Sequence, residues 1–238
     1  MTNLILTNYY NSCLDTQRNI FWDNNISNIM ELANSVKKYN QKLVVLTDCL
    51  DTSFNTQNLQ CIKVSLTNKH NVYWECYLQA KKYVEEHEEI DFIFMTDATD
   101  VIMLNNPFPY MERGMLYFGD EYKKDMSHSW VTHKKRVMCD EIKDIEEVLN
   151  SVPKETLLLN TGLIGGDRET FLLFLNKFCE LVEALRHVTY RDEFNTDGII
   201  GVYTAIKYFK GKYYQGNPIN TKFKAFEENN QACWFKHK

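Results

Sequence analysis

Short apolar runs alternate with longer amphipathic segments through roughly the first hundred residues of this chain. Four of the runs have the length and composition of buried strands: Leu4–Leu6, Lys42–Thr47, Cys61–Leu66 and Phe92–Met95. Between them, segments 26–39 and 71–87 repeat their apolar residues at helical spacing. Because alternating strands and helices are typical of a mostly parallel sheet flanked by helices, the pattern predicts an α/β fold.

The pattern is less regular after Pro107. Two strands and two helices are expected there: strands at Met115–Phe118 and Leu157–Asn160, and helices over 169–186 and 199–209. The first strand is expected to end at Gly119-Asp120, with a loop or short helices over 121–140. The second is expected to be interrupted by an Asn-Thr-Gly turn at 160–162, and Asp167 is expected to cap the helix that follows. No repeat or linker divides the chain, so we expect a single domain.

The composition favours a soluble protein in a reducing compartment. Hydrophobic residues make up 44% and charged residues 25% of the 238 residues, which is ordinary for a globular domain. The seven cysteines include no C-x-x-C pair, which fits reduced thiols better than a disulfide framework or a zinc site. The first residues lack the pattern of a signal peptide, and no stretch has the roughly 18 apolar residues of a membrane span. We therefore expect a cytoplasmic protein without a transmembrane segment.

Charge and short motifs argue against several function classes. The net charge is −5, and the basic triplet Lys134–Arg136 is interpreted as a solvated face, so nothing favours a nucleic-acid partner. Neither a G-x-G-x-x-G sequence nor a Walker A sequence occurs, so a dehydrogenase and a P-loop enzyme lose their main support.

Two carboxylates follow directly on one of the predicted strands. Asp97 and Asp100 come after the run Phe92–Met95 and before the stop Asn105-Asn106-Pro107. In open α/β sheets, ligands bind beyond the carboxyl ends of the strands. Two hard oxygen ligands converging there suit Mg²⁺ or Mn²⁺ that carries a diphosphate. The alternative is that Asp97 caps a turn and Asp100 is merely solvated.

Three other stretches carry candidate binding residues. The first predicted strand delivers Thr7-Asn8-Tyr9 and then Arg18, which could hold a base and a phosphate or form an ordinary polar loop. Asn160-Thr161-Gly162 could bring backbone close to a ligand or simply bend a strand. Asp197 opens a predicted helix, where capping is a sufficient explanation for a carboxylate. His237, in a basic terminus, could close over a diphosphate or be frayed and inert.

Together these residues resemble a nucleotide-sugar-dependent glycosyltransferase of the GT-A fold, and the resemblance extends over nearly the whole chain. Thr7-Asn8-Tyr9 is similar to the nucleotide-contacting start of glycogenin-like enzymes. Asp15–Arg18 and Ser35–Lys38 look like a subgroup that includes viral glycosyltransferase domains. Asp97 to Asp100 is similar to that subgroup's variant of the D-x-D motif, here spaced D-x-x-D.

The resemblance implies an activity and a role for each candidate residue. The activity is metal-dependent transfer of a hexose or pentose from a nucleoside-diphosphate sugar, a UDP-sugar, to an acceptor hydroxyl on a glycan or protein. Segment 1–108 would bind the nucleotide sugar, and segment 109–238 would bind the acceptor and complete the catalytic site. The implied roles are nucleotide contacts from Thr7, Asn8, Tyr9, Arg18 and Asp97, sugar or acceptor contacts from Asn160, Thr161 and Gly162, and Mn²⁺ or Mg²⁺ binding by Asp97, Asp100 and His237. Asp197 would orient the acceptor hydroxyl or act as its base.

Two other classes remain open at the level of the sequence. In a haloacid-dehalogenase-type phosphatase an apolar strand also ends in Asp, but its nucleophile and acid are two residues apart, and Thr99 stands in the second position here. A catalytically silent nucleotide-sugar-binding domain would keep the same binding residues without turnover.

Overall fold

The structure, a computed structural model, describes residues 1–67, 71–138, 140–185, 196–227, 230 and 232–238. Three of the sequence predictions fall outside these residues: the end of a helix at Arg186, the helix-opening residue Asn195, and the reduced thiol of Cys139. Cys49, Cys61, Cys76, Cys179 and Cys233 are free thiols, in agreement with the predicted reduced cysteines.

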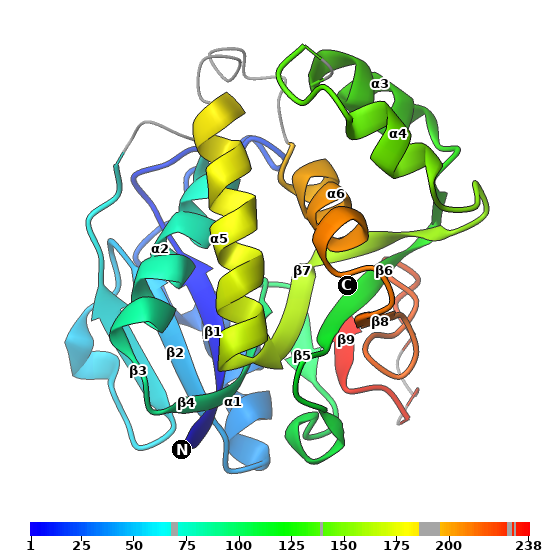
Figure 1. Ribbon diagram of the computed structural model, residues 1–238. Coiled ribbons are helices and arrows are strands. Elements are labelled where there is room, and N and C mark those ends of the chain that lie inside the picture. The colour runs from blue at the N-terminus through cyan, green and yellow to red at the C-terminus, as the bar shows by residue number, and fades with distance from the viewer. Residues whose placement is uncertain (68–70, 139, 186–195, 228–229, 231) are drawn as a thin grey trace.

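A seven-stranded sheet runs through both halves of the chain (Figure 1). In spatial order its strands are β3 (Leu59–Lys63), β2 (Lys42–Thr47), β1 (Thr2–Tyr9), β4 (Ile90–Thr96), β7 (Leu157–Asp167), β6 (Leu116–Asp125) and β8 (Tyr213–Gln215). The pairings β3–β2, β2–β1, β1–β4 and β6–β8 are parallel, whereas β7 is antiparallel to both β4 and β6. The predicted α/β fold with a mostly parallel sheet is confirmed.

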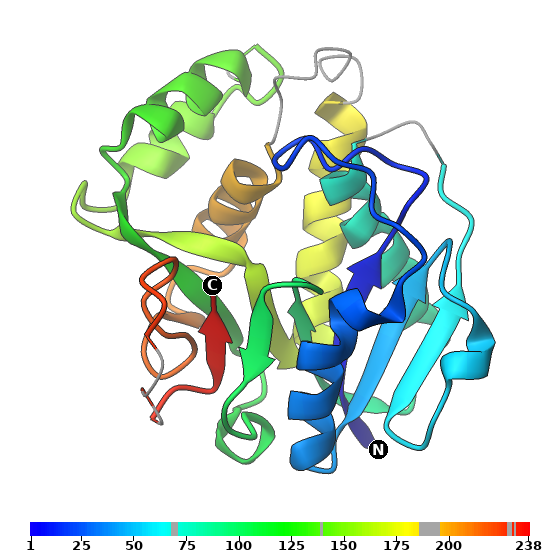
Figure 2. The same ribbon diagram turned by 180° about the vertical axis from the view of Figure 1, so that it is seen from behind.

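Helices cover both faces of this sheet (Figures 1 and 2). On one face lie α2 (Val72–Glu86), α5 (Arg168–Leu185) and α6 (Asp197–Tyr208), and on the other lies α1 (Met30–Lys38). Two further helices, α3 (Ser129–Met138) and α4 (Ile145–Asn150), pack beside α6. Single 3₁₀ turns occur at Ile26–Ile29, Thr52–Phe54 and Phe108–Tyr110.

Alternate residues of the central strands enter two separate cores. Leu4 and Leu6 of β1 pack with the cluster under α2 and α5, whereas Ile5 and Tyr9 pack with the cluster under α1. Because successive side chains of a strand point to opposite faces, a strand covered on both sides is apolar at every position. This explains why the central strands appear in the sequence as continuous apolar runs.

A second, two-stranded ladder brings the C-terminus to the middle of the molecule. β5 (Val101–Met103) pairs antiparallel with β9 (Phe235–His237), and Val101 lies opposite His237 (Figure 2). Since β5 begins directly after Asp100, this pairing brings the end of the chain next to the two carboxylates that follow β4.

Three boundary predictions are wrong. β6 does not end at Gly119-Asp120 but continues to Asp125, whereas the short helix α3 that follows agrees with the short helices expected in this segment. β7 is one continuous strand from Leu157 to Asp167, and in place of the predicted turn at 160–162 its register with β6 shifts, since Phe118 lies opposite Ile164 but Gly119 opposite Asn160. β3 covers Leu59–Lys63 instead of 61–66. In β6 and β7, polar side chains face a cavity inside the molecule. In a short segment of sequence, polar residues that face a cavity cannot be distinguished from polar residues that face solvent.

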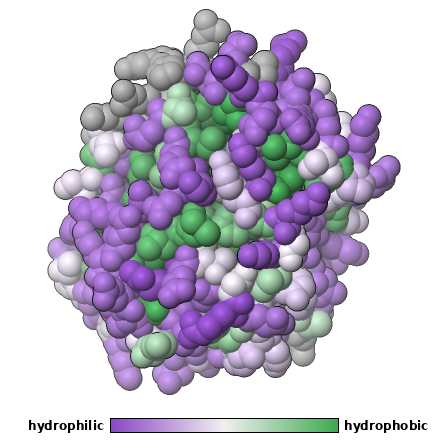
Figure 3. Space-filling view, in the orientation of Figure 1, coloured by the Kyte–Doolittle hydropathy of each residue, from purple (hydrophilic) through white to green (hydrophobic). Residues whose placement is uncertain are grey.

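Most of the surface that carries α2, α5 and α6 is hydrophilic, and apolar residues show in patches across its middle and upper part (Figure 3). No helix within the described residues has the length and apolarity to cross a membrane.

Gly165→Ala is expected to destabilise the fold by about 1 to 3 kcal/mol, because it overpacks a filled core. A Cβ at Gly165 would lie 2.3 Å from Cδ2 of Phe94, a fully buried ring that also packs at 4.6 Å between centroids against Phe235. Urea unfolding measures the loss. Gly119→Ala is the matched control, since its nearest atom is at 3.3 Å, and an equal loss in both variants would contradict this account.

Candidate functional site

The carboxyl end of β4 presents the two aspartates at the edge of the sheet. The Asp97 backbone N–H donates to the Gly162 carbonyl at 2.9 Å, which fixes the turn onto β7. The Asp97 side chain is 51% exposed and that of Asp100, just before β5, is 20% exposed. Both therefore lie at the carboxyl edge of the sheet, as the sequence predicts, and Asp97 also lines a cavity.

His237 lies against these carboxylates and is almost completely buried. Its Nε2 is 3.3 Å from Oδ2 of Asp97 and 3.9 Å from Oδ1 of Asp100. The β5–β9 pairing holds its backbone, Lys238 N–H donates to the Asp100 carbonyl at 2.9 Å, and the imidazole packs on Phe223 with 4.3 Å between ring centroids. The C-terminal histidine is therefore fixed in place by long-range contacts.

Three buried polar atoms in this group have no hydrogen-bond partner among the described residues: Oδ1 of Asp100 and both ring nitrogens of His237. One ligand atom from each of Asp97, Asp100 and His237 lies within 4.8 Å of the others. Burying polar atoms without partners is costly, and a cation bound here would satisfy Oδ1 of Asp100 and one ring nitrogen of His237. Burial first, and the Asp97 charge second, raise the pKa of Asp100, which is the effect that a bound cation would reverse. Two carboxylates and an imidazole fit a divalent metal ion such as Mn²⁺ or Mg²⁺.

Arg18 closes one side of the carboxylate group. Its guanidinium donates to Oδ2 of Asp15 at 2.9 Å and to Oδ2 of Asp100 at 2.8 Å. Asp15 also accepts a hydrogen bond from Tyr73 at 2.7 Å. Arg18, the residue predicted to bind phosphate, is thus held beside the carboxylates. Its positive charge offsets part of their negative charge.

Of the predicted residues at the end of β1, only Asn8 lines the cavity. Thr7 is fully buried and its hydroxyl donates to the Thr96 carbonyl at 2.7 Å. Tyr9 is 2% exposed and its hydroxyl donates to the Asp23 carbonyl at 2.9 Å. The side chains of Thr7 and Tyr9 are therefore engaged in packing, because they alternate with Asn8 along the strand.

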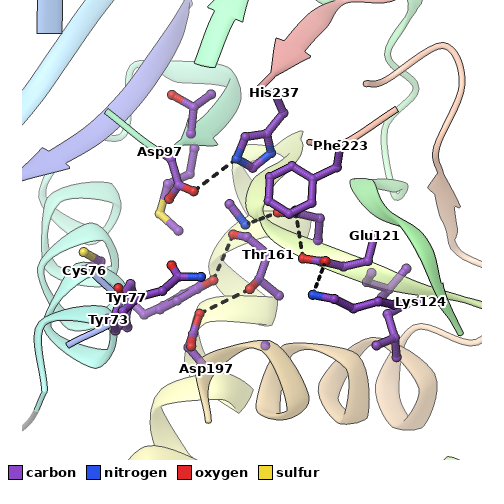
Figure 4. Close-up of a pocket in the computed structure, with 18 of the residues that line it drawn as sticks. Tyr73, Cys76, Tyr77, Asp97, Glu121, Lys124, Thr161, Asp197, Phe223 and His237 are labelled. Carbon is purple, nitrogen blue, oxygen red and sulfur yellow. Dashed lines mark hydrogen bonds and ion pairs between the residues drawn. The ribbon is translucent and has the colours of Figure 1, made fainter. Parts of the chain in front are cut away.

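A cavity of about 190 Å³ opens beside the carboxylates (Figure 4). Asp97 and His237 face each other on one side of it, Asp197 and Thr161 lie together below, and Glu121 with Lys124 lie opposite Tyr73 and Tyr77 (Figure 4). Its walls come from β1, α2, β4, β6, α3, β7, the start of α6 and the C-terminal segment. The cavity therefore contains contributions from both halves of the chain.

The predicted Asn160, Thr161 and Gly162 form part of its wall. Asn160 Oδ1 accepts from the Gly162 N–H at 2.8 Å, and its Nδ2 donates to Glu121 at 3.1 Å. Thr161 presents its carbonyl to the Tyr77 hydroxyl at 3.0 Å. Gly162 is packed so closely that a Cβ there would lie 2.4 Å from Oδ2 of Asp97. A side chain at this position is therefore incompatible with the present place of Asp97.

Asp197 is the first residue of α6 and points into the cavity (Figure 4). Its Oδ2 accepts from the Thr161 hydroxyl at 3.3 Å. Burial, followed by the negative charge of Asp97, raises its pKa to about 6. A half-buried carboxylate with this pKa is ionised at neutral pH and still has appreciable proton affinity, which suits a general base.

Sequence interpretation missed several wall residues: Glu121, Lys124, Tyr73, Tyr77, Trp130 and Phe223. Lys124 donates to Glu121 at 2.8 Å, and Glu121 in turn holds Asn160. Glu121 and Lys124 could have been identified from the sequence if the predicted strand Met115–Phe118 had been extended through the polar residues 121–125.

No protein-family model matches this chain, and no curated protein matches its sequence. The chemistry of the site is therefore inferred from its own geometry. A candidate cation position flanked by a guanidinium, next to a cavity with a carboxylate base, is suited to displacing a negatively charged leaving group by a hydroxyl.

Proposed function

We propose that this chain is a metal-dependent glycosyltransferase that moves a sugar from a nucleoside-diphosphate sugar, a UDP-sugar, to an acceptor hydroxyl on a glycan or protein. The observation that carries the proposal is the convergence of Asp97, Asp100 and His237, with buried unpartnered ligand atoms, at the mouth of a cavity that contains Asp197. A cytoplasmic location and a single GT-A domain belong to the same proposal. The Rossmann-like order of β3, β2, β1 and β4 supports the fold.

Asp97, Asp100 and His237 are the residues that would hold the metal. When bound there, a divalent cation neutralises charge on a diphosphate leaving group. Arg18 supplies a second positive charge at the same place, and its fork of N–H donors suits phosphate oxygens. Both effects favour breaking the bond between the sugar and the diphosphate, because negative charge accumulates on the departing oxygen.

Asp197 and the β7 residues would act on the acceptor side. Asp197 would orient the acceptor hydroxyl or take its proton, and its raised pKa supports that role. Asn160 and Thr161 offer amide and hydroxyl groups at the cavity wall, which are suitable partners for sugar hydroxyls.

A nucleotide thermal-shift screen tests the proposal. UDP, GDP and their common sugars are each added with and without Mn²⁺. At about 100 times Kd, a ligand of the native state stabilises it by about 2.7 kcal/mol, on the order of 5 °C in melting temperature for a chain of this size. We expect such a shift with a uridine nucleotide and Mn²⁺ together, and no shift in Asp100→Ala.

Glu180→Gln is the control variant, since Glu180 is an exposed carboxylate on α5 paired with Lys177 and should retain the full shift. Release of UDP from the donor is then measured with the same protein. Absence of a shift with every nucleotide would rule out the proposal, and hydrolysis of simple phosphate esters would then favour the phosphatase. A shift without turnover of any donor, with glycan acceptors present, would identify a silent binding domain.

A further inference from the structure

A second pocket, of about 650 Å³, lies at the other end of the β5–β9 ladder and shares no lining residue with the first. β5 and β9 run in opposite directions, so the chain after β5 and the chain before β9 meet at the same end (Figure 2). Trp234 precedes β9, and His237 ends it, so the strand separates them by about 10 Å. The pocket is within the usual size range of small-molecule sites.

Aromatic rings form much of its lining. The rings of Tyr110 and Trp234 are nearly parallel, at 15°, with centroids 6.4 Å apart. Tyr117 lies 5.5 Å from Trp234 and 5.5 Å from Tyr214. Tyr110 is 68% exposed and Tyr214 is 48% exposed, although both are large aromatic side chains. Four neighbouring rings with two open to solvent form a surface on which a flat, weakly polar ligand face can pack.

The backbone behind these rings is firmly held. The Trp234 carbonyl accepts from Leu104 N–H at 2.7 Å and Asn105 N–H at 3.1 Å, and its own N–H donates to the Pro218 carbonyl at 2.7 Å. The Tyr39 hydroxyl donates to the Leu104 carbonyl. A ligand would therefore meet a preformed arrangement of rings and would not have to order the chain.

The polar groups of the pocket indicate what charge a ligand bound there can carry. Asn105, Asn106, Gln215 and Asn217 supply amides, and Glu112 supplies one exposed carboxylate. Among the described lining residues none is Lys or Arg, so an anionic ligand such as a nucleotide or phosphate has no counter-charge here. Amides and a carboxylate are suitable partners for hydroxyl groups, which both donate and accept hydrogen bonds.

We propose that this pocket is a second carbohydrate-binding site that takes an uncharged oligosaccharide. A pyranose ring presents a face of C–H groups, which packs on the electron-rich face of an aromatic ring, and an edge of hydroxyls, which the amides and Glu112 bind. The inference does not rest on the transfer reaction, because no residue of the metal-binding group or of the first cavity takes part in it.

Titration calorimetry with maltohexaose, cellohexaose and hexa-N-acetylchitohexaose, all uncharged, tests the inference, with saturation-transfer NMR to detect weak binding. At least one of the three is expected to bind. Tyr110→Ala and Tyr214→Ala are each expected to weaken that binding about tenfold, because each removes one exposed ring from the pocket. Their melting temperatures should stay near that of the unmodified protein, since both side chains are largely exposed.

Two further variants show whether the sugar occupies this pocket and not another part of the surface. Tyr208→Ala removes a tyrosine of 40% exposure that does not line the pocket, and Asp197→Asn changes the first cavity, so both should leave oligosaccharide binding unchanged. Failure of all three sugars to bind at millimolar concentration would overturn the inference. So would binding that survives Tyr110→Ala but is lost in Asp197→Asn, or binding of a decaproline peptide in place of the sugars, since aromatic grooves also take proline-rich segments.

Discussion

Gly162→Ala is expected to weaken Mn²⁺ binding on the order of 100-fold, and also to cost some stability because the buried His237 ring must shift. The new Cβ would lie 2.4 Å from Oδ2 of Asp97 and 2.9 Å from Cε1 of His237. Because the Asp97 carboxylate is half exposed, it can rotate away at little cost to folding. That rotation removes it from the point where Asp100 and His237 converge, so the metal loses a ligand.

Gly166→Ala provides the matched control on the same strand. Its Cβ would approach Leu116 at 3.1 Å and the Met115 carbonyl at 3.2 Å, away from the carboxylates. Titration calorimetry with Mn²⁺ gives the affinity of each variant, and thermal unfolding reports its stability. Unchanged Mn²⁺ affinity in Gly162→Ala would show that Asp97 and His237 do not share a metal ion.

The sequence predicts the sheet well because the central strands are buried on both faces. Positions 43–46 of β2 are all fully buried, so every one of them is apolar. The strand can therefore be recognised from its own sequence, without knowledge of the strands that pair with it. The position of Asp97 follows from the same fact, since a residue directly after a buried parallel strand must lie at its carboxyl edge.

Prediction fails where polar residues line an internal cavity. Glu121 and Asn160 are polar members of β6 and β7, at places where the register between these strands shifts, and they bond to each other at 3.1 Å. Within a short window, a side chain that faces a cavity cannot be distinguished from one that faces solvent, so the pattern wrongly predicts that both segments leave the sheet. The prediction for Thr7, Asn8 and Tyr9 also goes too far. Successive side chains of a strand point to opposite faces, so the side chains of Thr7 and Tyr9 cannot line the same cavity as that of Asn8.

The place of His237 depends on contacts that local patterns do not contain. It reaches Asp97 only because three residues of β9 pair with β5, far away in the sequence. The resemblance to glycosyltransferases suggested the contact, and the geometry brings the imidazole within 3.3 Å of the carboxylate.

Asp197→Asn is expected to abolish transfer and yet stabilise the protein at pH 8. Loss of a general base lowers turnover on the order of a thousandfold. The stability effect follows from the pKa of Asp197, which burial and the Asp97 charge raise from 3.8 to about 6. Ionising a carboxyl group is harder in the folded chain than in the unfolded one, so the ionised group opposes folding.

The direction of the pH dependence is fixed by that difference. The folded state holds the Asp197 proton more tightly, so its stability relative to the unfolded chain falls as the pH rises from 3.8 to about 6. The difference corresponds to about 3 kcal/mol at most. An asparagine at this first turn of α6 also forfeits about 0.3 to 1 kcal/mol of interaction with the helix dipole. A net gain of about 1 to 3 kcal/mol is therefore expected at pH 8 and little gain at pH 4.

Asp144→Asn is the control with the opposite sign. Hydrogen bonds from Lys207 and Tyr203 lower the pKa of Asp144, so its ionised form favours folding and its removal should cost stability at pH 8. Urea unfolding at both pH values, with UDP release as the readout of activity, tests each variant.

Loss of transfer without gain of stability in Asp197→Asn would mean that its carboxylate is already compensated in the folded protein, whereas full transfer activity would remove Asp197 from the catalytic group. A gain in stability together with a loss of activity is the result expected of a residue whose charge is kept in the cavity for chemistry and at the expense of folding.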